Sequence, residues 1–432
     1  MFNFLAYALR LPRALIVFML SLTCTGLLQT AAPDRTYRMT DPAEKYQARA
    51  EILMQSTAAN LFDKGSRMVH SNSYNWLWTA GCWGTSSFLT AYTKLAALDA
   101  KYYWDVQKSL DALRFYSRSD ADGHFDGYTG TWAFFPGTAE GTLYYDDNMW
   151  ILRDNIFLYQ QTDKHKYLET AQAIADMLLR EGWDDIPEEY FTAKFGTPPA
   201  GPVGGFYWND DYNAMHVCSN GPAVQSLAML SQIADNGRGA EYLSYAESAY
   251  RFLTYLEKPN GVFWDLMTFT KDEENRITGI NRCEGQSYSY NSGTPISSAV
   301  ELYKVTGDAA YLADASRWAA GADAFFAQES SVPGLKEYTD LPWFREILLM
   351  GFIDVYPYDN TVLPFIQHME DSINYAYENH RLGGILGWNQ NLMPTAWVGG
   401  FADSESMKSM TSLNQCPMSG IYASLAAFYA AL

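Results

Sequence analysis

The sequence predicts an all-α protein built as a closed array of helical hairpins, and two observations lead to this prediction. The first is that apolar residues recur at helical spacing through most of the chain, which is typical of amphipathic helices packed on a core. The expected helices lie near residues 42–63, 85–99, 103–117, 144–161, 166–180, 221–235, 240–257, 294–305, 309–327, 343–355, 362–380 and 418–431.

The second observation is an internal repeat. The pattern Tyr-Leu-x-x-Ala begins at Tyr167, at Tyr242 and at Tyr311, each time shortly after a polar turn. One copy could be an ordinary helix start, but recurrence at intervals of tens of residues is typical of repeated helical pairs. We therefore expect hairpins that stack side by side.

Long connections rich in glycine and aromatic residues interrupt the expected helices, at 125–143, 196–211 and 272–293. We expect them to lack secondary structure of their own, and such loops are usually functional. No linker rich in proline or serine divides the chain, so residues 40–432 are expected to form a single domain.

Composition narrows the class of ligand. The chain has 432 residues and a formal net charge of −19, which disfavours nucleic acid because its phosphates would be repelled. It also has 13 Trp, 31 Tyr and 23 Phe residues. Aromatic faces beside polar side chains suit sugar rings, which stack on the face and offer hydroxyls for hydrogen bonds.

Residues 1–32 read as an export signal. Arg10 and Arg13 precede an apolar run at 14–20, and small residues at 30–32 offer a cleavage site; an uncleaved N-terminal anchor is the alternative. The protein is therefore expected to be secreted, periplasmic or at the cell surface, with no membrane span in the mature chain. The pairing of Cys82, Cys218, Cys283 and Cys416 is left open, since four cysteines allow three pairings.

Two neighbouring carboxylates, Asp146 and Asp147, begin one of the expected helices in the stretch GTLYYDDNMW. One explanation is structural, because aspartate caps helices and complements the dipole of their first turn. The other is catalytic: a retaining glycosidase needs two carboxyl groups about 5–5.5 Å apart, a separation that adjacent residues can reach. Repulsion between them would leave one protonated as an acid and the other ionised.

The same motifs resemble glycoside hydrolase family 76, the endo-α-1,6-mannanases and related cell-wall transglycosidases. YYDDNMW resembles the family's Asp-Asp motif, and it is followed in family order by GGFYWNDDYNAMHVCSNGPA (204–223), GVFWD (261–265), YSYNSG (288–293) and WFREIL (343–348). The resemblance covers roughly residues 40–430. It implies an (α/α)6 barrel, a six-hairpin toroid whose long aromatic-rich loops form a cleft.

The resemblance also implies roles. Asp146 would be the nucleophile and Asp147 the general acid/base. Substrate-binding residues would be Tyr145, Trp208, Asn209, Asn213, Asn220, Asp265, Tyr290 and Asn291. The chain departs from the family in having Tyr212 before Asn213, where a basic residue is common, and in an insert at 183–203 that could cover a subsite.

The expected function is a secreted, monomeric, retaining glycoside hydrolase that cleaves α-1,6-mannan through a covalent glycosyl-enzyme, without metal or cofactor. Three alternatives stay open. These are a transglycosidase that remodels cell-wall mannan or glycan anchors, a non-catalytic glycan-binding protein on the same scaffold, and another enzyme of a helical barrel, such as an unsaturated-uronide hydrolase. An unsaturated-uronide hydrolase acts on acidic sugars, and a chain with this much negative charge is poorly suited to bind them.

Overall fold

A computed structural model describes residues 30–384, 388–401 and 410–432, and these are mostly helical, as predicted. Most of the predicted export segment, residues 1–29, lies outside the described residues. The described helices are α3 (Pro42–Leu61), α4 (Cys82–Leu98), α5 (Tyr103–Leu113), α6 (Tyr145–Thr162), α7 (His165–Glu181), α8 (Glu188–Phe195), α9 (Val217–Ile233), α10 (Gly239–Thr254), α11 (Tyr290–Thr306), α12 (Ala309–Phe326), α13 (Pro342–Val355), α14 (Leu363–Asn379) and α15 (Ser412–Ala431).

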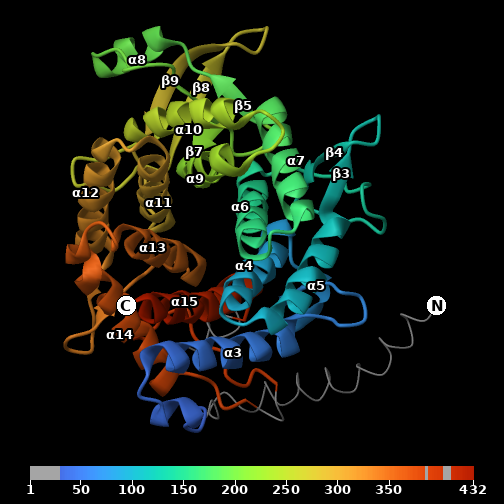
Figure 1. The fold of residues 1–432 in the computed structure, drawn as a ribbon, viewed down its shortest axis with the longest axis vertical. Helices are drawn as coiled ribbons and strands as arrows, with labels where there is room; N and C mark the ends of the chain where they lie inside the picture. Colours follow the sequence, from blue (N-terminus) through green and yellow to red (C-terminus); the bar gives the residue numbers. More distant parts are fainter. Residues whose placement is uncertain (1–29, 385–387, 402–409) are drawn as a thin grey trace.

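The helices are arranged in two layers (Figure 1). In the inner layer, α4 packs on α6, α6 on α9, α9 on α11, α11 on α13, α13 on α15, and α15 back on α4. In the outer layer, α5, α7, α10, α12 and α14 each pack on the inner helix that precedes them, while α3 packs on α15. The first and last described α-helices are therefore partners.

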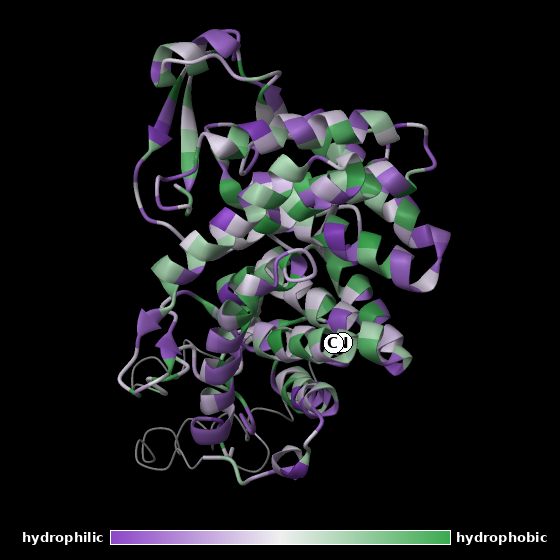
Figure 2. Ribbon diagram, turned by 60° about the vertical axis from the view of Figure 1, so that its left-hand side comes forward, coloured by the Kyte–Doolittle hydropathy of each residue, from purple (hydrophilic) through white to green (hydrophobic). Residues whose placement is uncertain are grey.

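The inner helices are buried around most of their circumference, whereas outer helices such as α7 bury one stripe. Hydrophobic and hydrophilic residues accordingly alternate along the ribbons (Figure 2). Two buried carboxyl groups inside the inner layer have polar partners: Lys94 of α4 donates to Glu346 of α13 at 2.6 Å, and Thr90 donates to Asp154 of α6 at 2.6 Å. Pairing offsets part of the cost of burying these charges.

Three inner helices begin one to two turns earlier than predicted: α9 at Val217, α11 at Tyr290 and α15 at Ser412. Each carries an internal proline in its second turn, Pro222, Pro295 or Pro417. Proline disfavours a helix interior, and Asn220-Gly221-Pro222 is in addition typical of a turn. Here the proline removes one hydrogen bond close to the helix end, which a packed helix tolerates.

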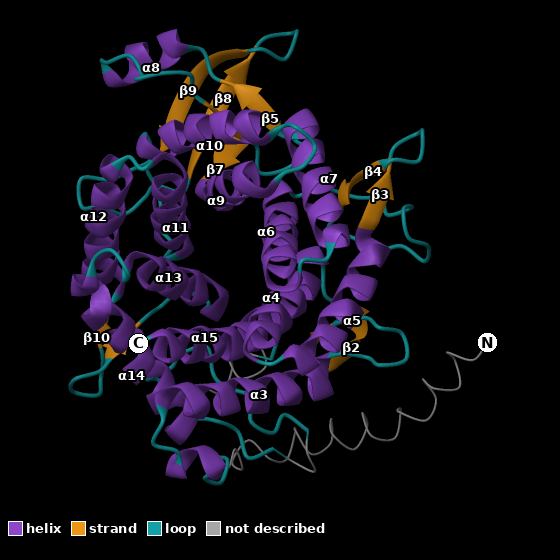
Figure 3. Cartoon of the chain, viewed as in Figure 1, coloured by secondary structure: helices purple, strands orange, loops and turns teal. Residues whose placement is uncertain are grey.

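The connections are not bare loops, and that prediction was wrong. They carry short antiparallel strands, of which β7, β8 and β9 form one three-stranded sheet beyond α9 and α10 (Figure 3). The insert at 183–203 also contains helix α8, which packs on β9. The strands are β1 (His70–Asn72), β2 (Asn75–Thr79), β3 (Ser117–Ser119), β4 (Phe125–Tyr128), β5 (Trp183–Asp185), β6 (Gly204–Phe206), β7 (Ala214–His216), β8 (Leu266–Lys271), β9 (Ile277–Cys283), β10 (Gln328–Glu329) and β11 (Lys336–Glu337).

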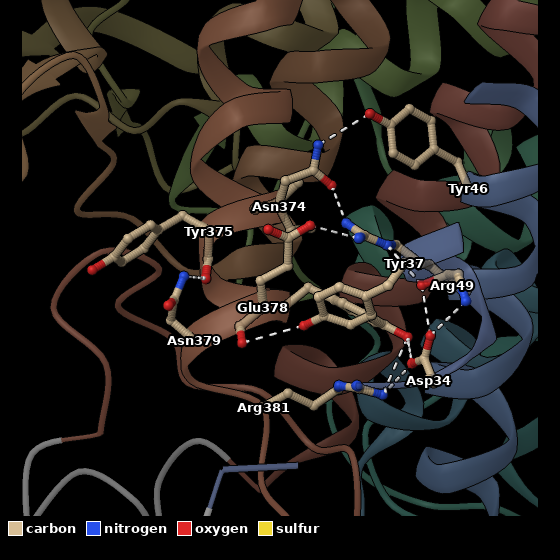
Figure 4. Close-up of polar contacts among 12 residues, drawn as sticks. Asp34, Tyr37, Tyr46, Arg49, Asn374, Tyr375, Glu378, Asn379 and Arg381 are labelled. Carbon is tan, nitrogen blue, oxygen red and sulfur yellow. Dashed lines mark hydrogen bonds and ion pairs between the residues drawn. The ribbon is translucent and has the colours of Figure 1, made fainter. Parts of the chain in front are cut away.

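The segment before α3 is fixed to the end of α14 by a polar network (Figure 4). Asp34 forms an ion pair with Arg381 at 2.7 Å and accepts a hydrogen bond from Tyr377. The buried guanidinium of Arg49 donates to Glu378 at 2.7 Å and lies 4.4 Å from the ring centre of Tyr377. Within the part of the chain that the structure describes, no helix has both the length and the apolar character needed to cross a bilayer.

Candidate active site

Asp146 and Asp147 are the second and third residues of α6, so neither is its N-cap. The N-cap is Tyr144, whose side chain makes no capping bond. An isolated bridge between Tyr144 and Asn209, and a hydrogen bond from the N–H of Tyr145 to the carbonyl of Trp208, fix the start of the helix. The capping explanation therefore fails for these two carboxylates, although both lie in the favourable first turn.

Asp146 is partly exposed and accepts several hydrogen bonds. Its Oδ2 accepts from Nε1 of Trp208 at 3.1 Å and from Sγ of Cys218 at 3.4 Å, and its Oδ1 accepts from the N–H of Asp147 at 3.0 Å. Burial raises the pKa of the Asp146 carboxyl, while the bonds from Cys218 and Trp208 hold that rise back. These donors favour the ionised form.

Asp147 has a different environment. It is only 8% exposed. Burial, and then the negative charge of Asp146, raise the pKa of the Asp147 carboxyl well above its ordinary value, opposed by one backbone N–H of Trp83. The pKa values of both carboxyls are raised, but that of Asp147 is raised further, because Asp147 lacks the side-chain donors that favour the ionised form of Asp146.

Four further side chains reach Asp146 indirectly. The ring of His216 packs on Trp208 with centroids 5.1 Å apart, and its Nδ1 lies 3.5 Å from Oδ2 of Asp265. Asn291 donates to the other oxygen of Asp265 at 2.8 Å. Tyr290 forms a hydrogen bond with Cys218, the donor to Asp146. The predicted residues Trp208, Asp265, Tyr290 and Asn291 therefore belong to one network around Asp146.

Aromatic side chains from the first turns of other inner helices gather beside this network. The ring centres of Tyr290 and Phe344 are 4.0 Å apart, and Phe344 stacks on Trp83 at 6.4 Å. Trp150 and Trp343 support them as a buried pair at 5.6 Å. Trp83, Tyr290 and Phe344 keep part of their surface open to solvent, so they can offer faces for stacking.

Four predicted substrate-binding residues have other surroundings. Tyr145 has no exposed surface, and its hydroxyl donates to the carbonyl of Glu181. Asn220 is fully buried and clamps the backbone of Phe206. Asn209 is 5% exposed and closes a local turn through Asp211, whereas Asn213 is exposed and directly precedes β7. The side chains of Tyr145, Asn209 and Asn220 therefore hold the backbone of the connections around the site.

Sequence reasoning missed Trp83, His216, Cys218 and Phe344. Trp83 lies in an apolar stretch and Phe344 in the motif at 343–348, where an aromatic residue is usually part of the hydrophobic core. Nothing in the sequence places a thiol against Asp146. The described cysteines, Cys82, Cys218, Cys283 and Cys416, are all free thiols. Among the described residues, no three His, Cys, Asp or Glu side chains are grouped as ligands for a metal ion.

One family model and several solved structures match this chain. The model of glycosyl hydrolase family 76 matches residues 124–423. No curated protein sequence matches the chain.

Several solved structures are similar in fold. A family 76 mannosidase from Bacteroides thetaiotaomicron has 24% identity and a TM-score of 0.71, covering 88% of this chain and 98% of that one. An α-1,6-mannanase from Salegentibacter, solved as an inactive variant with two adjacent Asp-to-Asn substitutions and bound to α-1,6-mannotriose, has 18% identity and a TM-score of 0.66, covering 89% and 99%. Dfg5 from Chaetomium thermophilum, bound to glucosamine, has 16% identity and a TM-score of 0.59, covering 90% and 91%.

Proposed function

The chain belongs to glycosyl hydrolase family 76, and on that premise we propose that it is an exported, retaining glycosidase that cleaves α-1,6-mannosidic linkages. The observation that carries the proposal is the unequal environment of the two aspartates. Asp146 accepts bonds from Trp208, Cys218 and the N–H of Asp147, whereas Asp147 is nearly buried beside its charged neighbour. One nucleophile and one acid are what double displacement requires.

In this proposal Asp147 protonates the departing glycosidic oxygen while Asp146 attacks the anomeric carbon. Oδ2 of Asp146 already accepts two hydrogen bonds, so Oδ1, which accepts one, is the attacking oxygen. The resulting glycosyl ester on Asp146 is neutral, which removes the repulsion that kept Asp147 protonated. Asp147, now a carboxylate, takes a proton from the incoming water and the ester is hydrolysed with overall retention.

The sugar contacts that we propose are Trp208, Tyr290, Trp83 and Phe344, with Asp265 and Asn291 supporting them. Residues 40–432 would form a single domain, an (α/α)6 barrel. Trp83, Tyr290, Asn291 and Phe344 lie in the first turns of inner helices, whereas Trp208 and Asp265 lie in the connections that carry β6–β8. The alternating pattern of inner and outer helix contacts supports this architecture. No metal or organic cofactor takes part in the proposed steps.

The test is hydrolysis of α-1,6-mannan followed by NMR of the first-formed anomer. Retention requires the α-anomer to appear first; a β-anomer would exclude the covalent route. Asp147→Asn should lower kcat by about 10²–10⁴-fold, with a smaller loss on an aryl mannoside, whose leaving group needs no proton. Asp146→Asn should lose activity on both substrates.

A matched control is Asp105→Asn, since Asp105 is also the third residue of a helix but belongs to outer helix α5 and pairs with Lys108. It should keep the activity of the natural sequence. Transfer to an added mannooligosaccharide in place of water would identify the transglycosidase alternative. Binding of mannan without turnover by the natural sequence would identify a non-catalytic glycan-binding protein.

A further inference from the structure

Two hollows on the outer side of the molecule join into one groove beside α5. The first, of about 310 Å³, is lined by the turn at 65–67, by Asp111, Arg114 and Phe115, and by Pro136. The second, of about 200 Å³, shares Arg67 and Asp111 with it and continues along α5 to Trp104. The first hollow alone falls within the range of about 300–1,000 Å³ typical of ligand sites.

The groove is basic on a chain that is strongly acidic. Its ionisable lining consists of Lys64, Arg67, Lys108 and Arg114 against a single carboxylate, Asp111. The whole chain, by contrast, has 49 acidic and 30 basic residues. A concave surface of one sign concentrates ligands of the opposite sign, so this groove is suited to an anion that the rest of the surface repels.

Within the described part of the chain, two of the four cations have no acidic partner. Arg67 pairs with Asp111, and Lys108 pairs with Asp105 at 2.8 Å. Lys64 and Arg114 are exposed, and neither forms an ion pair with any residue that the structure describes. The guanidinium of Arg114 therefore keeps its planar set of donors available, which matches a phosphate or carboxylate.

One strongly exposed aromatic ring, Trp104, lines the groove, and two more adjoin its lining residue Pro136 in the chain. Trp104 is 70% exposed at one end, and Phe134 and Phe135, next to Pro136, are 80% and 73% exposed. Large rings this open to water are costly unless they meet a partner, and a flat indole beside donors suits a sugar ring. The combination of free cations and an open tryptophan indicates a sugar that carries a negative charge.

We propose that the groove along α5 is an accessory binding site for an anionic glycan, one whose sugars bear phosphate or carboxylate groups. Arg114 and Lys64 bind the anion and Trp104 stacks on the sugar. The site is on outer helix α5, whereas the candidate catalytic pair is on inner helix α6, so it would hold the polymer and leave the chemistry to Asp146 and Asp147 (Figure 1). It does not depend on the proposed hydrolysis.

The experiment measures binding of the full chain to phosphorylated mannan, to the same mannan after dephosphorylation, to a polyuronate and to inorganic phosphate. We expect the phosphorylated mannan or the polyuronate to bind at least tenfold more tightly than neutral mannan, with affinity that falls as salt is raised. Equal affinity for phosphorylated and neutral mannan, together with no binding of polyuronate, would overturn the proposal. Phosphate as strong a ligand as the glycans would also overturn it.

Variants then locate the site. The double variant Lys64→Ala/Arg114→Ala should weaken binding of the anionic glycan at least tenfold, and Trp104→Ala should weaken it several-fold. The control Arg38→Ala/Lys194→Ala removes two exposed charges elsewhere and should bind normally. All variants should hydrolyse a short neutral mannooligosaccharide at the rate of the natural sequence. Undiminished glycan binding in either groove variant would exclude this location.

Discussion

The thiol of Cys218 donates a hydrogen bond to Oδ2 of Asp146 over 3.4 Å. Cys218 is the second residue of α9 and Asp146 the second residue of α6, so the contact joins the first turns of two neighbouring inner helices. Tyr290, the first residue of α11, in turn binds Cys218. Three helix N-termini thus meet at one carboxylate, and the position of that carboxylate depends on how the inner helices pack.

Removing this thiol should shift the pH dependence of activity. In Cys218→Ala the ionised form of Asp146 loses a donor, so its pKa rises and the acidic limb of kcat/KM should move to higher pH. We expect kcat to fall about 3- to 10-fold, the value of one hydrogen bond, with KM little changed. Cys218→Ser keeps a donor and should restore the pH profile. Cys416→Ala, which removes another buried thiol of an inner helix, is the control; an equal shift there would refute the role of Cys218.

Asp147→Asn should make the fold more stable at neutral pH. The pKa of Asp147 is raised in the folded protein, so the folded state binds a proton that the unfolded state releases, and stability falls as pH rises above the ordinary value near 3.9. The amide cannot ionise and avoids that loss. Each unit of pKa shift corresponds to about 1.4 kcal/mol, so we expect a higher Tm at pH 7 and little difference near pH 4. Thermal melts across this range would refute the raised pKa if the variant were equally stable, or less stable, at both pH values.

How much the sequence predicts differs between the fold and the site. Helical periodicity placed the long helices correctly, because each must bury an apolar face whatever its neighbours are. It could not place the starts of α9, α11 and α15, where Asn, Gly and Pro read as a turn and tertiary packing overrides local preference. It also could not predict α8, which packs on β9, or the strand β9, which pairs with β8; both lie in segments rich in turn residues.

The candidate site could be predicted from sequence only where its residues are adjacent or lie in motifs, and not where it depends on contacts between separate helices. Asp146 and Asp147 are adjacent in sequence, so their coupling can be inferred without coordinates. Trp208, Asp265 and Asn291 entered through quoted motifs, and the structure places them in one network. Cys218 lies in the same motif as Trp208 but, like Trp83, has no pattern that points at a carboxylate. Tyr145 and Asn220 were predicted to bind substrate because they lie in motifs. In the structure their side chains form hydrogen bonds with backbone groups of Glu181 and Phe206.

Gly293→Ala should destabilise the protein and damage the site together. Gly293 lies on α11 where it crosses α13, and a Cβ added there would come 2.4 Å from the carbonyl oxygen of Ile347. Backbone cannot move aside as a side chain can, so the two helices must separate, at a cost of about 1–3 kcal/mol. The shift would displace Tyr290 and Asn291, so we expect lower kcat as well as lower Tm. In Gly285→Ala the new Cβ meets nothing within 4 Å, and that variant should match the natural sequence in both measurements. A stable Gly293→Ala protein would contradict the close crossing.

The network before α3 predicts that Asp34→Asn destabilises the protein at neutral pH and destabilises it less in acid. Burial acts to raise the pKa of Asp34, but hydrogen bonds from Thr36 and Tyr377 and the charge of Arg381 outweigh it, so the pKa is lowered on folding. A lowered pKa means that Asp34 contributes stability above its unfolded value near 3.9, and that this contribution is lost as pH falls through the folded value. Because the carboxylate is partly exposed to solvent, we expect Asp34→Asn to lose only about 1 kcal/mol at pH 7 in urea unfolding. At about pH 3 the loss should be smaller, since the natural carboxyl is then partly protonated too. Asp122→Asn, at an exposed turn, should be neutral at both values. A loss for Asp34→Asn that was the same at pH 7 and in acid would mean that packing of the side chain, and not its charge, holds this segment against α14.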